Sequence, residues 1–144
     1  MGAVSIVTGS ADEAKRALGQ VKRVVRANYS GPASYGGGLA SNVLTDPELR
    51  KLWETELAQM RERIRSMRRQ LIEKIRALRA DYDLSYMLEQ RGMFSFSGLT
   101  KEQVGRLRDE HSIYALDNGR VCVAALNSRN IDYVAQAIAK VLVA

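Results

Sequence analysis

Apolar residues recur in steps of four and three through one long segment, and this pattern constrains the fold more than any other feature of the chain. Asp46 precedes the segment, Pro47 suits a first helical position, and Glu48 suits the positive end of a helix dipole. The spacing predicts a helix over residues 46–80. Its apolar seam consists of Trp53, Leu57, Met60, Ile64, Met67, Leu71, Ile75 and Leu78. Packing lengthwise within its own protein is the commonest use of such a helix. A coiled coil and a membrane-surface helix are the alternatives.

Composition indicates an ordinary globular protein. The chain has 144 residues, the usual size of one domain, with 46% hydrophobic and 26% charged residues. It contains neither an apolar run of roughly 18 residues nor an N-terminal signal pattern, so we expect a cytoplasmic protein without a membrane partner. The net charge of +6 is spread, and its densest part, residues 61–79, also carries Glu62 and Glu73. A solvated helix face therefore explains the charge better than a nucleic-acid site, and a basic anion binder is the weaker alternative.

The first 45 residues combine a strand signal, a helix signal and a glycine-rich segment. Residues 3–8 are short and β-branched and precede Gly9, which predicts a buried strand. Ser10, with Glu13 three residues later, predicts a capped helix ending near Arg26. Residues 29–38 contain four glycines and a proline and predict a turning loop, either a plain linker or a loop that lines a site.

The remainder alternates strand and helix signals and predicts a small α+β domain from about residue 81. Residues 93–97 alternate as a strand, and Thr100 with Gln103 predicts a capped helix. Residues 113–116 and 120–124 flank an Asn-Gly turn, which predicts a hairpin. Asn127 is the expected cap of a final helix whose apolar spacing runs to the end of the chain.

Few residues suggest chemistry on their own. The single histidine, His111, follows a predicted helix and is expected to be a surface or helix-end residue. The single cysteine, Cys122, lies in an apolar run typical of a core thiol. No cluster has metal-ligand spacing, and no phosphate loop is present. Arg26 and Arg120 stand beside a loop and a turn, where a guanidinium can bind a carboxylate through two parallel hydrogen bonds. Surface ion pairing is the alternative for both arginines.

Three runs of sequence resemble one enzyme family. Residues 26–30 read Arg-Ala-Asn-Tyr-Ser, residues 91–104 include Met-Phe-Ser-Phe-Ser-Gly-Leu, and residues 119–127 read Gly-Arg-Val-Cys-Val-Ala-Ala-Leu-Asn. In this order they resemble the last third of the aspartate and aromatic-amino-acid aminotransferases, fold type I enzymes that use pyridoxal phosphate. The resemblance implies an α/β to α+β fold. It also implies three parts: the end of a large cofactor-binding domain over 1–45, a connecting helix over 46–80 and a small α+β domain over 81–144.

The resemblance also implies roles for four residues, with amino-acid and 2-oxo-acid substrates and a homodimer. Arg120 matches the arginine that binds the substrate's α-carboxylate. Arg26 matches the arginine that reaches the neighbouring subunit's site and binds a side-chain carboxylate, and Ser30 lies in the same intersubunit loop. Phe94 matches an aromatic residue of the substrate pocket. The family commonly has Ser-Asn-Pro-Pro where this chain has Ser-Gly-Pro-Ala at residues 30–33, which favours broad acceptance of aromatic substrates.

The resemblance covers only the part of the family that follows the cofactor site. The lysine that forms the Schiff base and the acid that pairs with the pyridinium nitrogen lie upstream in the family. None of the six lysines here has a similar context: Lys15, Lys22, Lys51, Lys74, Lys101 and Lys140. We therefore expect no catalytic residue in this chain, no activity in isolation, and a need for a complementing N-terminal segment. A non-catalytic interaction or dimerisation module is the alternative function.

Overall fold

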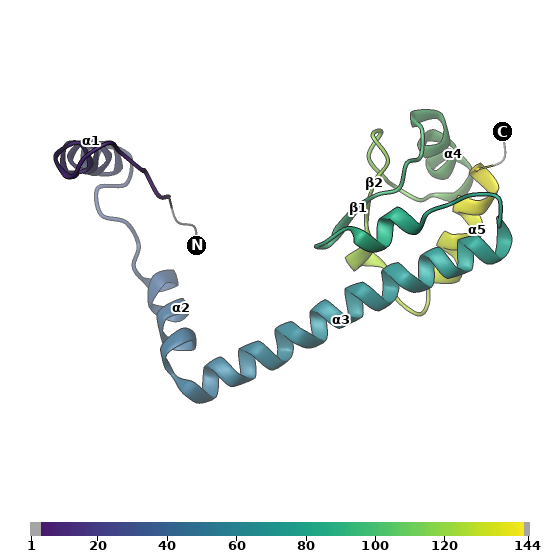
Figure 1. Cartoon of the computed structure of the whole chain (residues 1–144), viewed down its shortest axis with the longest axis horizontal. Helices are drawn as coiled ribbons and strands as arrows, with labels where there is room; N and C mark the ends of the chain where they lie inside the picture. Colours follow the sequence, from purple (N-terminus) through teal and green to yellow (C-terminus); the bar gives the residue numbers. More distant parts are fainter. Residues whose placement is uncertain (1–3, 143–144) are drawn as a thin grey trace. The chain divides into compact units, whose positions relative to one another are not determined.

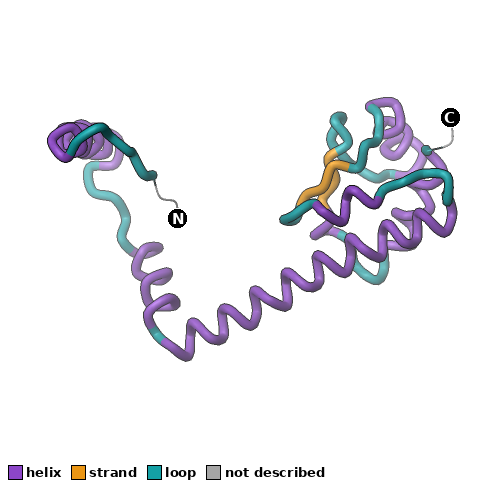
Figure 2. Tube along the Cα trace, viewed as in Figure 1, coloured by secondary structure: helices purple, strands orange, loops and turns teal. Residues whose placement is uncertain are grey.

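Helices make up most of the computed structural model, which describes residues 4–142, and the described part has one two-stranded sheet (Figure 1, Figure 2). The elements are α1 (Ala11–Tyr29), α2 (Tyr35–Thr45), α3 (Pro47–Leu78), η1 (Ser85–Glu89), β1 (Phe94–Phe96), α4 (Lys101–His111), β2 (Arg120–Cys122), η2 (Val123–Ala125) and α5 (Ile131–Val141). Two compact units, residues 1–54 and 55–144, divide the chain within α3. The mixture of helices with a small antiparallel sheet agrees with the predicted α+β class.

The first helix begins with the predicted capping interaction. Ser10 Oγ accepts from the Glu13 N–H at 3.3 Å, and Glu13 Oε2 accepts from the Gly9 N–H at 2.9 Å. The helix continues beyond Arg26 to Tyr29, where Ser30 takes a φ of 62° and ends it. The predicted helix is confirmed, and its end lies three residues later than the sequence indicated.

The predicted strand over residues 3–8 is wrong for residues 4–8, while Ala3 lies outside the described residues. Residues 4–8 form no ladder, and the side chains of Val4 and Val7 are 90% and 96% exposed. A strand exists only when a neighbouring strand accepts and donates its backbone hydrogen bonds. Residues 4–142 supply no such neighbour to residues 4–8, so β-branched composition alone does not produce a strand there.

The glycine-rich segment is also not the continuous loop that the sequence predicted. Residues 31–34 are non-helical, but α2 begins at Tyr35 and includes Gly36, Gly37 and Gly38. The Gly38 N–H donates to the Ser34 carbonyl at 2.9 Å and starts the helical ladder. Glycine weakens a helix without forbidding it, and local hydrogen bonds satisfy the backbone here.

The long helix α3 confirms the main prediction from the sequence. Asp46 Oδ1 accepts from the N–H groups of Glu48 and Leu49 at 2.9 and 3.0 Å, which fixes the start of the helix. Burial along the seam is uneven, because Leu71 and Ile75 are 2% and 1% exposed, whereas the residues nearer the N-terminal end are open. The half-exposed seam residues are Trp53, Leu57 and Met60, together with Leu78 at the C-terminal end of the helix. The seam of α3 is therefore buried mainly around residues 68–75.

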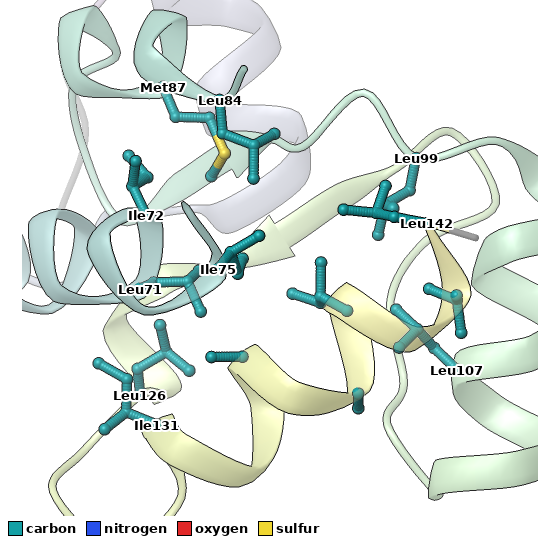
Figure 3. Close-up of a cluster of buried hydrophobic side chains, with 14 of the residues drawn as sticks. Leu71, Ile72, Ile75, Leu84, Met87, Leu99, Leu107, Leu126, Ile131 and Leu142 are labelled. Carbon is teal, nitrogen blue, oxygen red and sulfur yellow. The ribbon is translucent and has the colours of Figure 1, made fainter. Parts of the chain in front are cut away.

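The core of the second unit lies where α3, α4 and α5 meet (Figure 3). The side chains of Leu71 and Ile75 point from α3 toward α5, and Leu107 contributes from α4. Thr100 Oγ1 accepts from the Gln103 N–H, and Gln103 Oε1 accepts from the Thr100 N–H, so the predicted capping box at the start of α4 is confirmed. This core supports the sheet.

The sheet pairs β1 with β2 in antiparallel register, with Phe94 opposite Cys122 and Phe96 opposite Arg120. The predicted hairpin between residues 113–116 and 120–124 is therefore wrong, although its turn forms. Gly119 takes the positive φ, at 79°, while Asn118 Oδ1 accepts from the Arg120 N–H at 3.1 Å. Residues 113–116 form no strand, and their backbone hydrogen bonding with this segment is confined to the turn, where the Leu116 N–H donates to the Arg120 carbonyl at 3.2 Å and the Gly119 N–H to the Leu116 carbonyl at 2.8 Å.

Asn127 was predicted to cap the final helix, and this prediction is wrong. Helix α5 begins at Ile131, and Asn130 precedes it without a side-chain cap. Asn127 Oδ1 accepts from the Arg129 N–H at 2.9 Å, so this side chain closes a turn before the helix. Asx side chains stabilise turns and helix caps through the same hydrogen bond, and sequence alone does not separate the two uses.

Candidate functional site

The exposed face of the β1–β2 ribbon brings together two of the four predicted site residues. Side chains alternate between the faces of a strand, and directly paired residues share a face. Phe94, Phe96, Arg120 and Cys122 therefore share one face and are exposed, whereas Ser95 is buried on the other. The guanidinium carbon of Arg120 lies 4.9 Å from the centroid of the Phe94 ring.

This contact orients Arg120 while leaving its hydrogen-bonding edge available. A guanidinium above an aromatic face is held by the ring's quadrupole. No carboxylate of residues 4–142 forms an ion pair with Arg120. Its parallel N–H donors match the two oxygens of a carboxylate. The ribbon face thus presents a cation suited to an anionic ligand beside apolar rings, of which Phe96 is 54% exposed.

Two residues of this face were misjudged or missed from the sequence. Cys122 is exposed, so its prediction as a core thiol is wrong. Its pairing with Phe94 puts it on the open face, and Val123, which begins η2, is the fully buried neighbour instead. Phe96 was not singled out, although its two-residue spacing from Phe94 is the signal that would have found it.

Gly119 fixes the start of β2 immediately before Arg120. Its carbonyl accepts from the N–H and the Oγ–H of Ser97 at 3.0 and 2.7 Å. A Cβ at this position would lie 2.7 Å from the carbonyl oxygen of Leu99. Both the positive φ and the close backbone approach therefore require glycine.

Gly119→Ala should destabilise the chain by more than about 2 kcal/mol, since the left-handed backbone of an L-residue costs roughly 1–2 kcal/mol and the clash adds to it. Gly92→Ala is the matched control, because Gly92 has a φ of 81° with open space around its Cβ position. Urea denaturation of both variants measures the difference. Equal destabilisation by the two substitutions would contradict the role of the close approach at Gly119.

Arg26 and Ser30 lie in the first unit. Arg26 is in the last turn of α1, and its carbonyl accepts from the Ser30 N–H at 3.0 Å. Both side chains are exposed. The two residues are thus neighbours at one helix end, as the shared loop implied, and their side chains are open to a partner.

His111 was expected at the surface or at a helix end, and the structure confirms the helix end. It is the last residue of α4, but its side chain is 14% exposed, and its Nε2 is buried without a hydrogen-bond partner in the described chain. The ring packs edge-on against Tyr133, with centroids 6.3 Å apart.

Within residues 4–142 no group of three His, Cys, Asp or Glu side chains is arranged to bind a metal. No helix in that range is long and apolar enough to cross a membrane.

Comparison with known proteins identifies the family. The model of the class I and II aminotransferases matches residues 1–138. The chain belongs to this aminotransferase family. It is 54% identical over 142 residues to an aspartate aminotransferase of Pseudomonas aeruginosa, covering 99% of this chain and 36% of that protein. It is 42% identical over 142 residues to the aromatic-amino-acid aminotransferase of Escherichia coli, again covering 99% of this chain and 36% of that protein. The chain thus spans about a third of the length of these aminotransferases.

A solved aminotransferase has the same fold over this segment. The aromatic-amino-acid aminotransferase of Burkholderia pseudomallei, covalently bound to pyridoxal phosphate, superposes with a TM-score of 0.87 at 56% identity. The match covers 95% of this chain and 34% of that enzyme. The predicted resemblance and the fold type I architecture are confirmed.

The residues present do not fit the cofactor of that relative. Chemistry with pyridoxal phosphate requires a lysine amine and an acidic partner for the pyridine nitrogen. The ribbon face supplies an arginine, two aromatic rings and a thiol, and Lys74 and Lys101 are paired with Asp132 and Asp117. The ribbon face of this aminotransferase chain therefore suits an anionic ligand and lacks the lysine and the acid that the cofactor needs.

Proposed function

We propose that these residues are the C-terminal, substrate-binding segment of an aspartate or aromatic-amino-acid aminotransferase. In the complete enzyme, an amino group passes between an amino acid and a 2-oxo acid. Arg120 binds the α-carboxylate that all of these substrates share, and Phe94 holds the guanidinium in place while lining the pocket. The observation that carries the proposal is the Arg120–Phe94 contact on an exposed face where no carboxylate of the described chain competes for the arginine.

The cofactor of the complete enzyme is proposed to be pyridoxal phosphate, which the Burkholderia pseudomallei relative carries. The groups that bind and activate it belong to sequence beyond these 144 residues, which cover 36% of the Pseudomonas aeruginosa relative. We accordingly assign residues 1–45 to the end of the large domain, 46–80 to the connecting helix and 81–144 to the small domain. A cytoplasmic homodimer is the proposed assembly.

Arg26 and Ser30 are proposed to act across the subunit interface of that homodimer. Both side chains are exposed at the end of α1, which suits contact with a second subunit. Arg26 would bind the side-chain carboxylate of a dicarboxylic substrate. The Gly31-Pro32-Ala33 sequence that follows Ser30 lacks the family's usual Asn and second Pro, so we propose that the enzyme also accepts phenylalanine and tyrosine.

Visible absorbance with added pyridoxal phosphate, coupled to transamination assays, tests whether the chain functions alone. We expect no saturable cofactor band and no turnover with aspartate or tyrosine and 2-oxoglutarate. A stable band with turnover would show that one of the six lysines serves as the catalytic amine and would overturn the assignment of a substrate-binding segment.

A groove on the second unit supports the need for a complementing segment. A cavity of about 670 Å³ lies between α3 and residues 88–93. Its apolar lining is half-exposed, with Met60 56% and Met93 50% open to solvent. Exposed apolar surface of this kind marks an interface. The cationic part of the lining consists of Arg61, Arg65, Arg68, Arg69 and Arg91.

The charges around this groove favour an acidic occupant. Glu62 is the carboxylate nearest to these arginines, at 2.7 Å from Arg65 and 3.9 Å from Arg61. Within the described chain, no carboxylate pairs with Arg69 or Arg91. A segment that presents apolar side chains together with carboxylates would therefore fill the groove and neutralise it.

The alternative function is a non-catalytic module that pairs with intact aminotransferase subunits through the same exposed surfaces. Size-exclusion chromatography separates the two functions. Co-elution with intact subunits, without activity of its own, supports the module, whereas separate elution counts against it. For the isolated chain we expect self-association, because its uncovered apolar surface is large, and a monomeric, cooperatively melting chain at dilute concentration would contradict this expectation.

A further inference from the structure

A buried arginine on α3 holds the strand that carries Phe94. Arg68 is 4% exposed, and its Nε–H donates to Ser95 Oγ at 3.1 Å. Its terminal N–H donates to the carbonyl of Gly92 at 2.6 Å. Ser95 is the middle residue of β1, and Gly92 makes the turn before the strand with a φ of 81°. One guanidinium therefore fixes both the turn and the centre of the strand.

Burial of this charge is costly for the fold. Removing a guanidinium from water costs several kcal/mol unless a good partner compensates, and apolar replacement of a buried charge is often neutral or stabilising. Arg68 donates to neutral oxygens, and burial and the neighbouring charges of Arg65 and Arg91 lower its pKa. Stability alone therefore gives no reason for an arginine here. Its two directed hydrogen bonds define the position of β1 in a way that an apolar side chain does not.

The position of β1 determines the geometry of the candidate site. Ser95 points to the buried face, so Phe94 and Phe96 on either side of it point to the open face. β1 is also the partner of β2, and Phe96 pairs with Arg120. The Met93 carbonyl accepts from the Val123 N–H at 2.9 Å and ties the far end of β2 to the same segment. A shift of β1 on α3 therefore moves the Phe94–Arg120 pair with it.

We propose that Arg68 is a positioning residue for substrate binding, which fixes β1, and through β1 the Phe94–Arg120 pair, on the long helix. This inference rests on the proposed carboxylate-binding role of Arg120. Arg68 was not predicted from the sequence, because its charge excluded it from the apolar seam. Its spacing of four from Ile64 and three from Leu71 nevertheless puts it beside that seam, and this is the signal that would have found it.

The test uses a graft enzyme in which these 144 residues replace the matching segment of the Pseudomonas aeruginosa aspartate aminotransferase. Arg68→Met removes both hydrogen bonds and the charge, and Ser95→Ala removes one hydrogen bond with little change in volume. Arg76→Met is the matched control on the same helix, since Arg76 is exposed, lies outside the groove lining and donates no hydrogen bond to β1 in the described chain. Arg68→Lys keeps the charge but loses the two-point geometry.

We expect Arg68→Met to raise KM for aspartate and tyrosine alike, with kcat/KM falling roughly 10- to 100-fold, because ångström-scale displacement of a binding group has effects of that size. The melting temperature should change little. Ser95→Ala and Arg68→Lys should fall between Arg68→Met and the unsubstituted graft, and Arg76→Met should match the graft. An unchanged KM in Arg68→Met would overturn the proposal.

Hydrogen exchange measured by mass spectrometry on the same variants separates positioning from general stability. In Arg68→Met we expect faster exchange confined to residues 92–97 and 120–124, with α4 and α5 unchanged. Uniformly faster exchange would overturn the proposal in favour of a general structural role. If the unsubstituted graft does not transaminate, the proposed function fails, and the exchange data still decide whether Arg68 holds the ribbon.

Discussion

Arg120→Leu in the graft enzyme should lower kcat/KM for every amino-acid substrate by roughly 30-fold to several thousand-fold. Removing one partner of a desolvated, hydrogen-bonded charge pair costs about 2–5 kcal/mol, and each 1.4 kcal/mol is a factor of ten. The loss should be similar for aspartate and phenylalanine, because both have the α-carboxylate that Arg120 is proposed to bind. Steady-state transamination with the two amino acids measures it.

Two controls define what the Arg120 result means. Arg120→Lys retains the positive charge without the planar pair of donors, so it should recover only part of the activity. Arg129→Leu removes an exposed arginine away from the ribbon face and should leave kcat/KM unchanged. A loss of activity confined to aspartate would contradict α-carboxylate binding, since it would mean that Arg120 binds the side-chain carboxylate of the substrate.

Ile75→Ala should destabilise the second unit by about 2–5 kcal/mol, the range for truncation of a large aliphatic core side chain. Ile75 is 1% exposed on α3 and packs within the core cluster. The loss approaches the whole stability of a small domain, so we expect a partly unfolded chain at 37 °C. Urea denaturation followed by far-ultraviolet circular dichroism measures the change.

Leu78→Ala is the matched control for Ile75, because Leu78 lies on the same helix and seam but is 53% exposed. Its truncation should change the stability by less than about 1 kcal/mol, as alanine favours the helix and little apolar contact is lost. Equal destabilisation at the two positions would show that the seam is buried along its whole C-terminal end and would refute the packing described for α3.

Features that depend on local sequence were predictable. The seam of α3, its Asp46 cap and the Thr100–Gln103 capping box each depend on residues within four positions of one another. The assignment of Arg120 and Phe94 to one substrate site followed from family resemblance rather than from spacing, because the two residues are 26 positions apart. The ribbon register then brought them together.

Features that depend on long-range pairing were not predictable in the same way. Residues 113–124 have a strong local hairpin signal, but β1 pairs with β2, and only the Gly119 turn remains from the prediction. Cys122 was assigned to the core because its neighbours are apolar, whereas its register opposite Phe94 exposes it. Residues 4–8 show that a strand signal without a partner strand does not form a strand.

Transamination by the unsubstituted graft enzyme tests the central claim most directly, since it asks whether these 144 residues bind substrate for a cofactor held elsewhere. We predict that the graft binds pyridoxal phosphate and transfers amino groups from both aspartate and tyrosine to 2-oxoglutarate, while this chain alone transfers none. A folded graft that binds the cofactor but turns over neither amino acid would contradict the claim that Arg120 and its ribbon are a substrate-binding site.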